Sequence, residues 1–309
     1  MKIRMTVSVL ALALAAVTAP AGAQDGNQTA PTAPSAELVA FLKNLHKQTG
    51  DVAIPAAHAV MHLGARYYFL GPDEAKRVLV DVWRNPPSEA EGVLGLVMPA
   101  DKTVLDESWG AIVTYEDSGY VPDTDASTQD YDKVLSDMRS GEAAGNEERR
   151  KLGYPEAHLM GWAQPPSYDK ASHSLVWARD IKFGNAPVDG LNYDVRSLGR
   201  HGVLSLNMLW DMSHLADTRT AAAELGKAVA FDKGAAYTDY DKSVDKTAEY
   251  GLAGLVAAGA GIVVAKKLGL LAIMFGFGKW ILIGLAAVGA TMRRWIGKIF
   301  NRSRDTLEG

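Results

Sequence analysis

The chain has 309 residues, 48% of them hydrophobic and 22% charged, which is the composition of a globular protein and excludes a largely disordered one. The absence of cysteine excludes disulfides, thiol catalysis and cysteine-ligated metal sites. A formal net charge of −4 provides no basic field for nucleic acid, so no nucleic-acid partner is expected.

The N-terminus has the three parts of a secretory signal peptide. In chain order these are Lys2 and Arg4, the apolar run 7–17 and, after Pro20, the small residues 21–23. The pattern predicts cleavage after Ala23, so that residues 1–23 are the signal peptide; the alternative is an uncleaved N-terminal anchor. Residues 24–49 then form a leader rich in Pro, Ala and Thr, ending in a short amphipathic helix from Ser35.

Residues 50–250 are predicted to form an extracytoplasmic α+β domain, with an antiparallel sheet and flanking helices. The predicted strand segments are 52–70, 93–98, 111–115, 174–181, 191–198, 203–209 and 235–240. The predicted helices are 71–83, 130–138, 142–152 and 218–229. Residues 199–202 form a hairpin turn, and Ser243 caps a helix that leads into the C-terminal segment.

Residues 251–292 are predicted to form a membrane-anchor region, followed by a basic tail at 293–309. The most favourable crossing is 268–292, although Lys279 near its centre costs about 2.5–3.5 kcal/mol on insertion scales. One crossing places the basic tail in the cytoplasm, as the positive-inside rule favours.

Two alternatives to a single crossing stay open. The segment could form a helical hairpin with arms at 251–265 and 280–292, or a buried pair of soluble helices. Small residues at helical spacing, Ala253, Ala257 and Gly261, suit close contact with a protein partner or with a second copy of the chain.

Seven segments of this domain carry a resemblance to a known family. They are WRNPP (83–87), GYVPDTDA (119–126), DYDKVLSDM (130–138), NEERRKLGYP (146–155), GWAQPPSYDKASH (161–173), LNYDVRSLGR (191–200) and YTDYDKSVDKTAEYG (237–251). In this order they resemble a bacterial family of uncharacterised membrane-anchored proteins with a domain of unknown function. The resemblance runs from residue 50 to the anchor.

The resemblance implies an architecture and no chemistry. It implies a signal peptide, an envelope domain and a C-terminal anchor, and therefore the bacterial inner membrane with the main domain in the periplasm. Family members are sometimes labelled predicted regulators of amylopullulanase, a starch-debranching enzyme, but no residue here accounts for that label. The family supplies no catalytic residues to carry over.

Catalytic motifs are incomplete in this sequence. There is no Walker A loop, G-x-S-x-G elbow or H-E-x-x-H motif. His58 and His62 have i, i+4 spacing, but no acidic residue close by in the sequence completes a metal site. Ser-x-x-Lys occurs at 167–170 and 243–246 without the Lys-Thr-Gly motif that accompanies it in acyl-transfer enzymes.

Two Asp-rich segments are candidate sites for a hard cation such as calcium. The candidate ligands are Asp123 and Asp125, with Asp130 and Asp132 nearby, and then Asp239, Asp241 and Asp245. Neither segment has the Gly and Glu positions of an EF-hand, and the alternative is that these aspartates cap turns and helices.

Aromatic, basic and acidic residues concentrate between residues 162 and 201. The candidate ligand-binding residues are Trp162, Tyr168, Asp169, His173, Tyr193, Arg196 and Arg200, accompanied by Trp177 and His201. Such residues can line a site for a sugar, a peptide or an anion. The alternative is a sheet with aromatic cross-strand pairs and structural arginines.

These patterns predict a non-enzymatic envelope protein that binds a partner or regulates an envelope process, with no cofactor. The alternative is an envelope hydrolase or ligand-binding module that acts on glycan or peptide through the aromatic, Arg and Asp face. Asp169, Asp180 and Asp194 are the carboxylates available to a hydrolase, and no feature selects a pair. A third reading is a transport or membrane-stress accessory in which Lys279 faces a helix partner.

Overall fold

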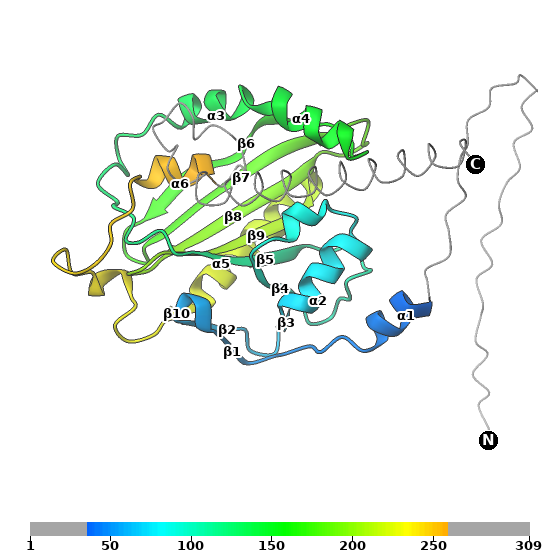
Figure 1. Ribbon diagram of the computed structural model, residues 1–309, viewed down its shortest axis with the longest axis horizontal. Helices are drawn as coiled ribbons and strands as arrows, with labels where there is room; N and C mark the ends of the chain where they lie inside the picture. Colours follow the sequence, from blue (N-terminus) through cyan, green and yellow to red (C-terminus); the bar gives the residue numbers. More distant parts are fainter. Residues whose placement is uncertain (1–35, 259–309) are drawn as a thin grey trace, which may run out of the picture. The chain divides into compact units, whose positions relative to one another are not determined.

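The computed structural model describes residues 36–258 (Figure 1). The chain divides between Lys43 and Asn44, and the short helix α1 (Ala36–Lys43) before this division buries none of its side chains. The predicted signal peptide, the 268–292 crossing and the basic tail lie outside the described residues. Among the described helices, none combines the length and the hydrophobicity that a bilayer crossing requires.

A seven-stranded antiparallel sheet dominates the second unit. In spatial order its strands are β3 (Tyr67–Leu70), β4 (Val93–Pro99), β5 (Gly110–Glu116), β9 (Val203–Asp211), β8 (Gly190–Leu198), β7 (Ser174–Phe183) and β6 (Ala157–Asp169). Every neighbouring pair is antiparallel, which confirms the predicted α+β class. The hairpin turn between β8 and β9 is also confirmed, because the N–H of Gly199 donates to the carbonyl of Gly202 at 2.8 Å.

A second, three-stranded sheet packs its buried side chains, among them Val52 and Met61, in one core with those of the main sheet. Its order is β1 (Asp51–Ile54), β2 (Ala59–His62) and β10 (Val229–Phe231), with the 3-10 helix η1 (Pro55–Ala57) between β1 and β2. The β-rich segment predicted at 52–70 is thus three short strands, two in this sheet and one at the edge of the main sheet.

The helices flank both faces of the main sheet. They are α2 (Pro72–Arg77), the π-helix η2 (Val78–Val82), α3 (Tyr131–Arg139), α4 (Glu142–Lys151), α5 (Leu215–Ala228) and α6 (Leu252–Ala258), with 3-10 turns η3 (Pro87–Ala90), η4 (Met212–His214) and η5 (Tyr237–Asp239). Helix α5 packs on β8 and β9, α3 and α4 pack on β6, and α2 packs on β4 (Figure 1).

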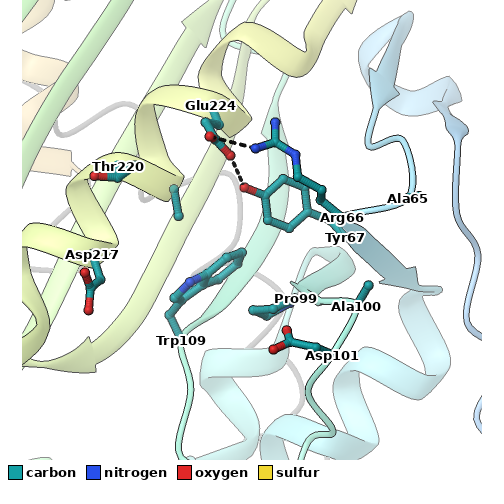
Figure 2. Close-up of a pocket in the computed structure, with 11 residues that line it drawn as sticks. Ala65, Arg66, Tyr67, Pro99, Ala100, Asp101, Trp109, Asp217, Thr220 and Glu224 are labelled. Carbon is teal, nitrogen blue, oxygen red and sulfur yellow. Dashed lines mark hydrogen bonds and ion pairs between the residues drawn. The ribbon is translucent and has the colours of Figure 1, made fainter.

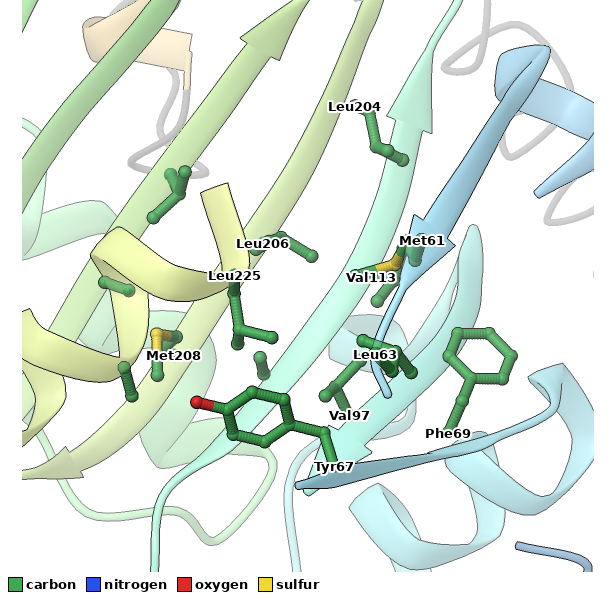
Figure 3. Close-up of a cluster of buried hydrophobic side chains, with 14 of the residues drawn as sticks. Met61, Leu63, Tyr67, Phe69, Val97, Val113, Leu204, Leu206, Met208 and Leu225 are labelled. Atoms are coloured by element: carbon green, nitrogen blue, oxygen red, sulfur yellow. The ribbon is translucent and has the colours of Figure 1, made fainter. Parts of the chain in front are cut away.

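Strand alternation divides the buried side chains into two cores. The core on the α5 side includes Met61, Leu63, Tyr67, Phe69, Val97, Val113, Leu204, Leu206, Met208 and Leu225 (Figure 3). The core on the opposite side includes Val134, Met138, Leu175, Trp177, Leu198, Val203, Tyr250 and Leu255. Both faces of the sheet are therefore covered over much of their area.

Three sequence-based predictions of elements were wrong or incomplete. The predicted strand 235–240 forms only an isolated bridge between Ala236 and Gly199, and Tyr237–Asp239 is the turn η5. The Asp239 carboxylate accepts hydrogen bonds from the backbone N–H groups of Gly234 and Ala236, which favours the turn. Ser243 caps no helix, since its hydroxyl and its N–H both donate to Asp241. Strand β6 was not singled out by the sequence.

Candidate functional site

The predicted binding residues lie on both faces of the main sheet and in its turns. Trp162 and Arg196 are on the face opposite α5, where the Trp162 indole donates to the Tyr131 carbonyl at 3.2 Å. The guanidinium of Arg196 stacks 5.2 Å from the ring centroid of Trp177. The structure thus brings Arg196 into contact with Trp177, while Trp162 contacts Tyr131 on the same face.

Tyr168 and His173 meet at one end of the same face. The Tyr168 hydroxyl donates to Asp123 at 3.0 Å and lies 3.2 Å from His173 Nδ1. Burial raises the pKa of Tyr168, and the Asp123 carboxylate raises it further. The His173 ring packs against Tyr237 at 4.3 Å. These groups form a packed, hydrogen-bonded cluster.

The other three predicted residues lie elsewhere. Tyr193 points to the α5 side, where its hydroxyl donates to Gln164 Oε1 at 2.9 Å. Asp169 closes the β6–β7 turn by accepting from the Ala171 N–H at 2.8 Å. Arg200, in the β8–β9 turn, forms a bidentate ion pair with Asp245 at 2.8 and 3.0 Å.

The Asp-rich segments use their carboxylates within the fold. Asp125 caps α6, Asp239 and Asp241 cap turns, and Asp245 pairs with Arg200. Within residues 36–258, no three His, Asp or Glu side chains are grouped as metal ligands would be.

The two histidines of the His58–His62 motif, and Ser243 and Lys246 of the second Ser-x-x-Lys motif, each contact other partners. The His62 ring pairs with Asp51 across β1 and β2 at 2.8 Å, whereas His58 meets His201 edge to face at 6.5 Å. Lys246 donates to the Asp117 carbonyl, and the Ser243 hydroxyl donates to Asp241.

Ser213, His214 and Asp211 are the residue types of a catalytic triad, but their geometry is different. The Ser213 hydroxyl and the Asp211 carboxylate both approach the same nitrogen, His214 Nδ1, at 3.2 and 2.9 Å. A triad needs the serine on Nε2 and the carboxylate on Nδ1, so that the imidazole can carry a proton between them. This group is a helix-start cap.

An open pocket of about 540 Å³ lies on the α5 side of the sheet (Figure 2). It is lined by Ala65, Arg66, Tyr67, Pro99, Ala100, Asp101, Trp109, Asp217, Thr220, Ala221 and Glu224. Residues 217, 220, 221 and 224 belong to one face of α5 because they follow helical i, i+3, i+4 and i+7 spacing. The facing wall comes from the start of β3, the end of β4 and the residue just before β5.

A hydrogen-bonded group forms one side of this pocket. The Arg66 guanidinium donates to Glu224 Oε1 at 2.8 Å, and the Tyr67 hydroxyl donates to Glu224 Oε2 (Figure 2). Burial raises the pKa of Tyr67 to about 12, with the Glu224 carboxylate as the next cause. The hydrogen bonds from Tyr67 and Arg66 lower the pKa of Glu224, so this carboxylate is a weak base.

The rest of the pocket is aromatic and acidic. The rings of Tyr67 and Trp109 lie 5.6 Å apart at a tilt of 54°, and Figure 2 shows Asp217 and Asp101 on either side of Trp109 in that view. Asp101 and Asp217 make no hydrogen bond or ion pair with their side chains within the described part of the chain. A cation can be held by carboxylates and by aromatic faces together.

Sequence reasoning missed this pocket. Its residues come from positions 65–67, 99–101, 109 and 217–224, which no local pattern connects. The one available signal was the spacing of Asp217, Thr220, Ala221 and Glu224 on a predicted helix, and that spacing is equally ordinary for a helix with one solvated edge.

The fold and the site together define an α+β protein with an antiparallel sheet, flanking helices and an open pocket lined by aromatic and acidic side chains. The chain belongs to the family described as Protein of unknown function (DUF2167), whose model matches residues 46–289. This confirms the resemblance to a family with a domain of unknown function.

Other comparisons add little. No curated protein matches the sequence. The solution structure of cyanobacterial PsbP (CyanoP) from Synechocystis sp. PCC 6803 is similar with a TM-score of 0.34 and 8% identity, covering 61% of this chain and 92% of that one. A similarity of this size carries no inference about function.

Proposed function

We propose that this protein is an exported, membrane-anchored, non-enzymatic accessory protein whose pocket binds a cationic group of a partner protein. The observation that carries the binding role is a pair of carboxylates, Asp101 and Asp217, that have no side-chain partner within residues 36–258 and line the same pocket as the Tyr67 and Trp109 rings. An amine or guanidinium would gain charge-assisted hydrogen bonds from the carboxylates and a cation–π contact from the rings.

A catalytic role is less well supported at this pocket. Thr220 donates its hydroxyl to the Ala216 carbonyl at 3.1 Å, and no base approaches it among the lining residues. The lowered pKa of Glu224 also makes it unsuited to act as a general acid near neutral pH. Binding without chemistry is what the lining residues favour.

The proposed localisation and membrane topology are supported by the sequence alone. The pattern at residues 1–23 supports export, and the apolar segment 268–292 followed by basic residues supports a single anchor. A fluorescent or phosphatase reporter fused after Gly309 tests the topology. A fluorescent, phosphatase-negative fusion supports one crossing, and the reverse result would replace it with a hairpin or with no crossing.

The binding role is tested with peptides and the full chain in lipid nanodiscs. A lysine-rich peptide is titrated while the tryptophan fluorescence is followed, and the same peptide with acetylated lysines is the ligand control. We expect saturable binding of the unmodified peptide only, because acetylation removes the positive charge. Equal binding of both peptides would reject a cation site.

Two variants locate the site. Asp101→Asn with Asp217→Asn should weaken peptide binding by roughly two- to thirtyfold, because both carboxylates are exposed and an exposed ion pair contributes about 0.2–1 kcal/mol. Glu147→Gln, an exposed change on α4, is the matched control and should leave binding unchanged. Unchanged binding by the double variant would place the peptide elsewhere.

A further inference from the structure

The face of the main sheet opposite α5 carries a polar cluster at its centre. We call it the arginine cluster, and its members are Arg179, Asn192, Asp194, Arg196, Ser205 and Asn207. The strand registers place Arg179 beside Asn192 and Arg196 beside Ser205. On this face α3 and α4 lie over β6 and α2 lies over β4 (Figure 1), and α6 packs in the same core as Trp177 and Val203.

The arginine cluster has more positive than negative charge. Asp194, which is fully buried, accepts from Arg196 at 2.8 Å and from Arg179 at 3.3 Å, so one carboxylate serves two guanidinium groups. Two further carboxylates, Glu89 and Glu116, are outside the cluster. The charge of Glu89, in the turn η3, raises the pKa of Arg179, but this is the last of the causes that act on it. The Glu116 carboxylate accepts a hydrogen bond from the Tyr250 hydroxyl at 2.6 Å.

Burial makes this excess charge unfavourable. Arg179 is 7% exposed, and desolvation lowers the pKa of its guanidinium despite the attraction of Asp194, with Arg196 acting in the same direction as desolvation. Buried charges normally have partners that match them in number. The cluster is therefore short of negative charge.

The cluster is also short of hydrogen-bond acceptors. Two buried donors of the cluster, Arg179 Nε and Arg196 Nε, have no acceptor among the described residues, and neither has the Nε1 of Trp177, whose ring Arg196 covers. Asp194 Oδ1 already accepts from Asn207 as well as from Arg196, and Asn192 Oδ1 already accepts from Arg179 at 3.0 Å. A buried N–H without an acceptor is costly, and here all three unmet groups are donors.

We propose that the arginine cluster binds a small oxyanion, a carboxylate or a phosphate group. An oxyanion would supply both the missing charge and the missing acceptors, and the planar guanidinium groups match its geometry. The Arg179 and Arg196 side chains are only 9% and 13% exposed, which limits the ligand to a single small anionic group. The site goes beyond the proposed function, because the cation pocket is on the other side of the sheet.

The experiment titrates the full chain in nanodiscs with inorganic phosphate and, separately, with acetate. Sodium chloride keeps the ionic strength constant. NMR follows the Nε–H signals of Arg179 and Arg196 and the indole N–H of Trp177, assigned through Arg179→Lys, Arg196→Lys and Trp177→Phe. We expect saturable shifts of all three signals with one shared Kd. The tighter-binding probe then identifies phosphate or carboxylate as the ligand chemistry.

Variants give a second readout. Arg196→Gln should weaken anion binding by about tenfold or more, because it removes charged donors. Arg150→Gln, on the exposed side of α4, is the matched control and should leave the Kd unchanged. If Arg196→Gln does not fold, the titration of the unchanged chain still decides. Signals that stay fixed, or that move linearly with both anions, would overturn the proposal.

Discussion

The carboxylate of Asp125 caps a helix that begins at Leu252, 127 residues later in the chain. It accepts hydrogen bonds from the backbone N–H of Leu252 at 3.1 Å and from that of Ala253 at 3.3 Å. The first N–H groups of a helix have no partner within the helix, and an Asp side chain satisfies them well. The start of α6 is therefore set by a tertiary contact.

Removing this cap should destabilise the domain. Asp125→Ala is expected to lower the free energy of unfolding by about 1 kcal/mol, the usual value of an N-cap side chain. Chemical denaturation of the full chain measures the loss. Asp125→Asn is the control and should lose less, because an amide oxygen can still accept. Equal stability of the alanine variant and the unchanged chain would contradict the cap.

The same cap predicts a coupling with Gly251. A Cβ at this position would lie 2.6 Å from Asp125 Oδ2, so Gly251→Ala forces the carboxylate to move. We expect Gly251→Ala to cost less stability when Asp125 is already alanine, and a double-mutant cycle measures the difference. Strict additivity of the two changes would show that the crowding is relieved elsewhere.

Asn146 joins α4 to the edge strand β6 through its side-chain amide. Its Nδ2 donates to the Ala157 carbonyl at 3.0 Å and its Oδ1 accepts from the Ala157 N–H at 2.8 Å. The side chain is buried, so Asn146→Asp sets an acceptor against a carbonyl and should cost about 1–3 kcal/mol of unfolding free energy. Thermal and denaturant unfolding measure it, with Glu147→Gln as the exposed neighbour. A loss of unfolding free energy in Asn146→Asp no larger than that in Glu147→Gln would contradict this role of Asn146.

The strands that sequence patterns predicted well are those with clear alternation and clear turns. In β8, Leu191, Tyr193 and Val195 point to one core while the intervening residues are polar, and the glycine-containing turn 199–202 fixes the hairpin. Strand β6 gave no such signal. Its Pro165 and Pro166 are residues that central strands exclude, and they are tolerated there because β6 is an edge strand.

Long-range contacts account for the remaining differences. The turn at Tyr237 looked like a strand because its tyrosines favour strands, but Asp239 holds the backbone in a turn. The pocket joins Tyr67, Trp109 and Glu224 from distant positions, so only the folded chain shows it. In the predicted binding cluster, Tyr193 and Arg196 are three residues apart on β8, so their side chains point to opposite faces of the sheet. This separation follows from the alternation of side chains along a strand and could have been predicted from the sequence.

The ion pair between Arg200 and Asp245 should make the free energy of unfolding depend on pH in the acidic range. Its hydrogen bonds hold the pKa of Asp245 below the usual value of about 3.9. A carboxyl whose pKa is lower in the folded state stabilises the fold above its unfolded pKa, and the contribution is lost as the pH falls through the folded pKa. Asp245→Asn should therefore reduce stability at neutral pH and make little difference in strong acid. Unfolding curves across this range measure it; a pH-independent difference would contradict the assignment.

The bond between Tyr67 and Glu224 should be visible in the titration of the tyrosine. The pKa of Tyr67 is raised to about 12, first by burial and then by the carboxylate. Glu224→Ala should lower that pKa while leaving it above the ordinary value of about 10, because the ring stays buried. Difference absorbance against Tyr67→Phe isolates the signal. Asp217→Ala changes a carboxylate on the same face of α5 and should leave the Tyr67 titration unchanged.

The raised pKa of Tyr67 also makes folding stability depend on pH. Because its pKa is higher in the folded state than in the unfolded state, Tyr67 adds stability below about pH 10, and this contribution disappears as the pH rises through 12. A Glu224→Ala chain in which Tyr67 still titrates near 12 would mean that burial alone sets the shift.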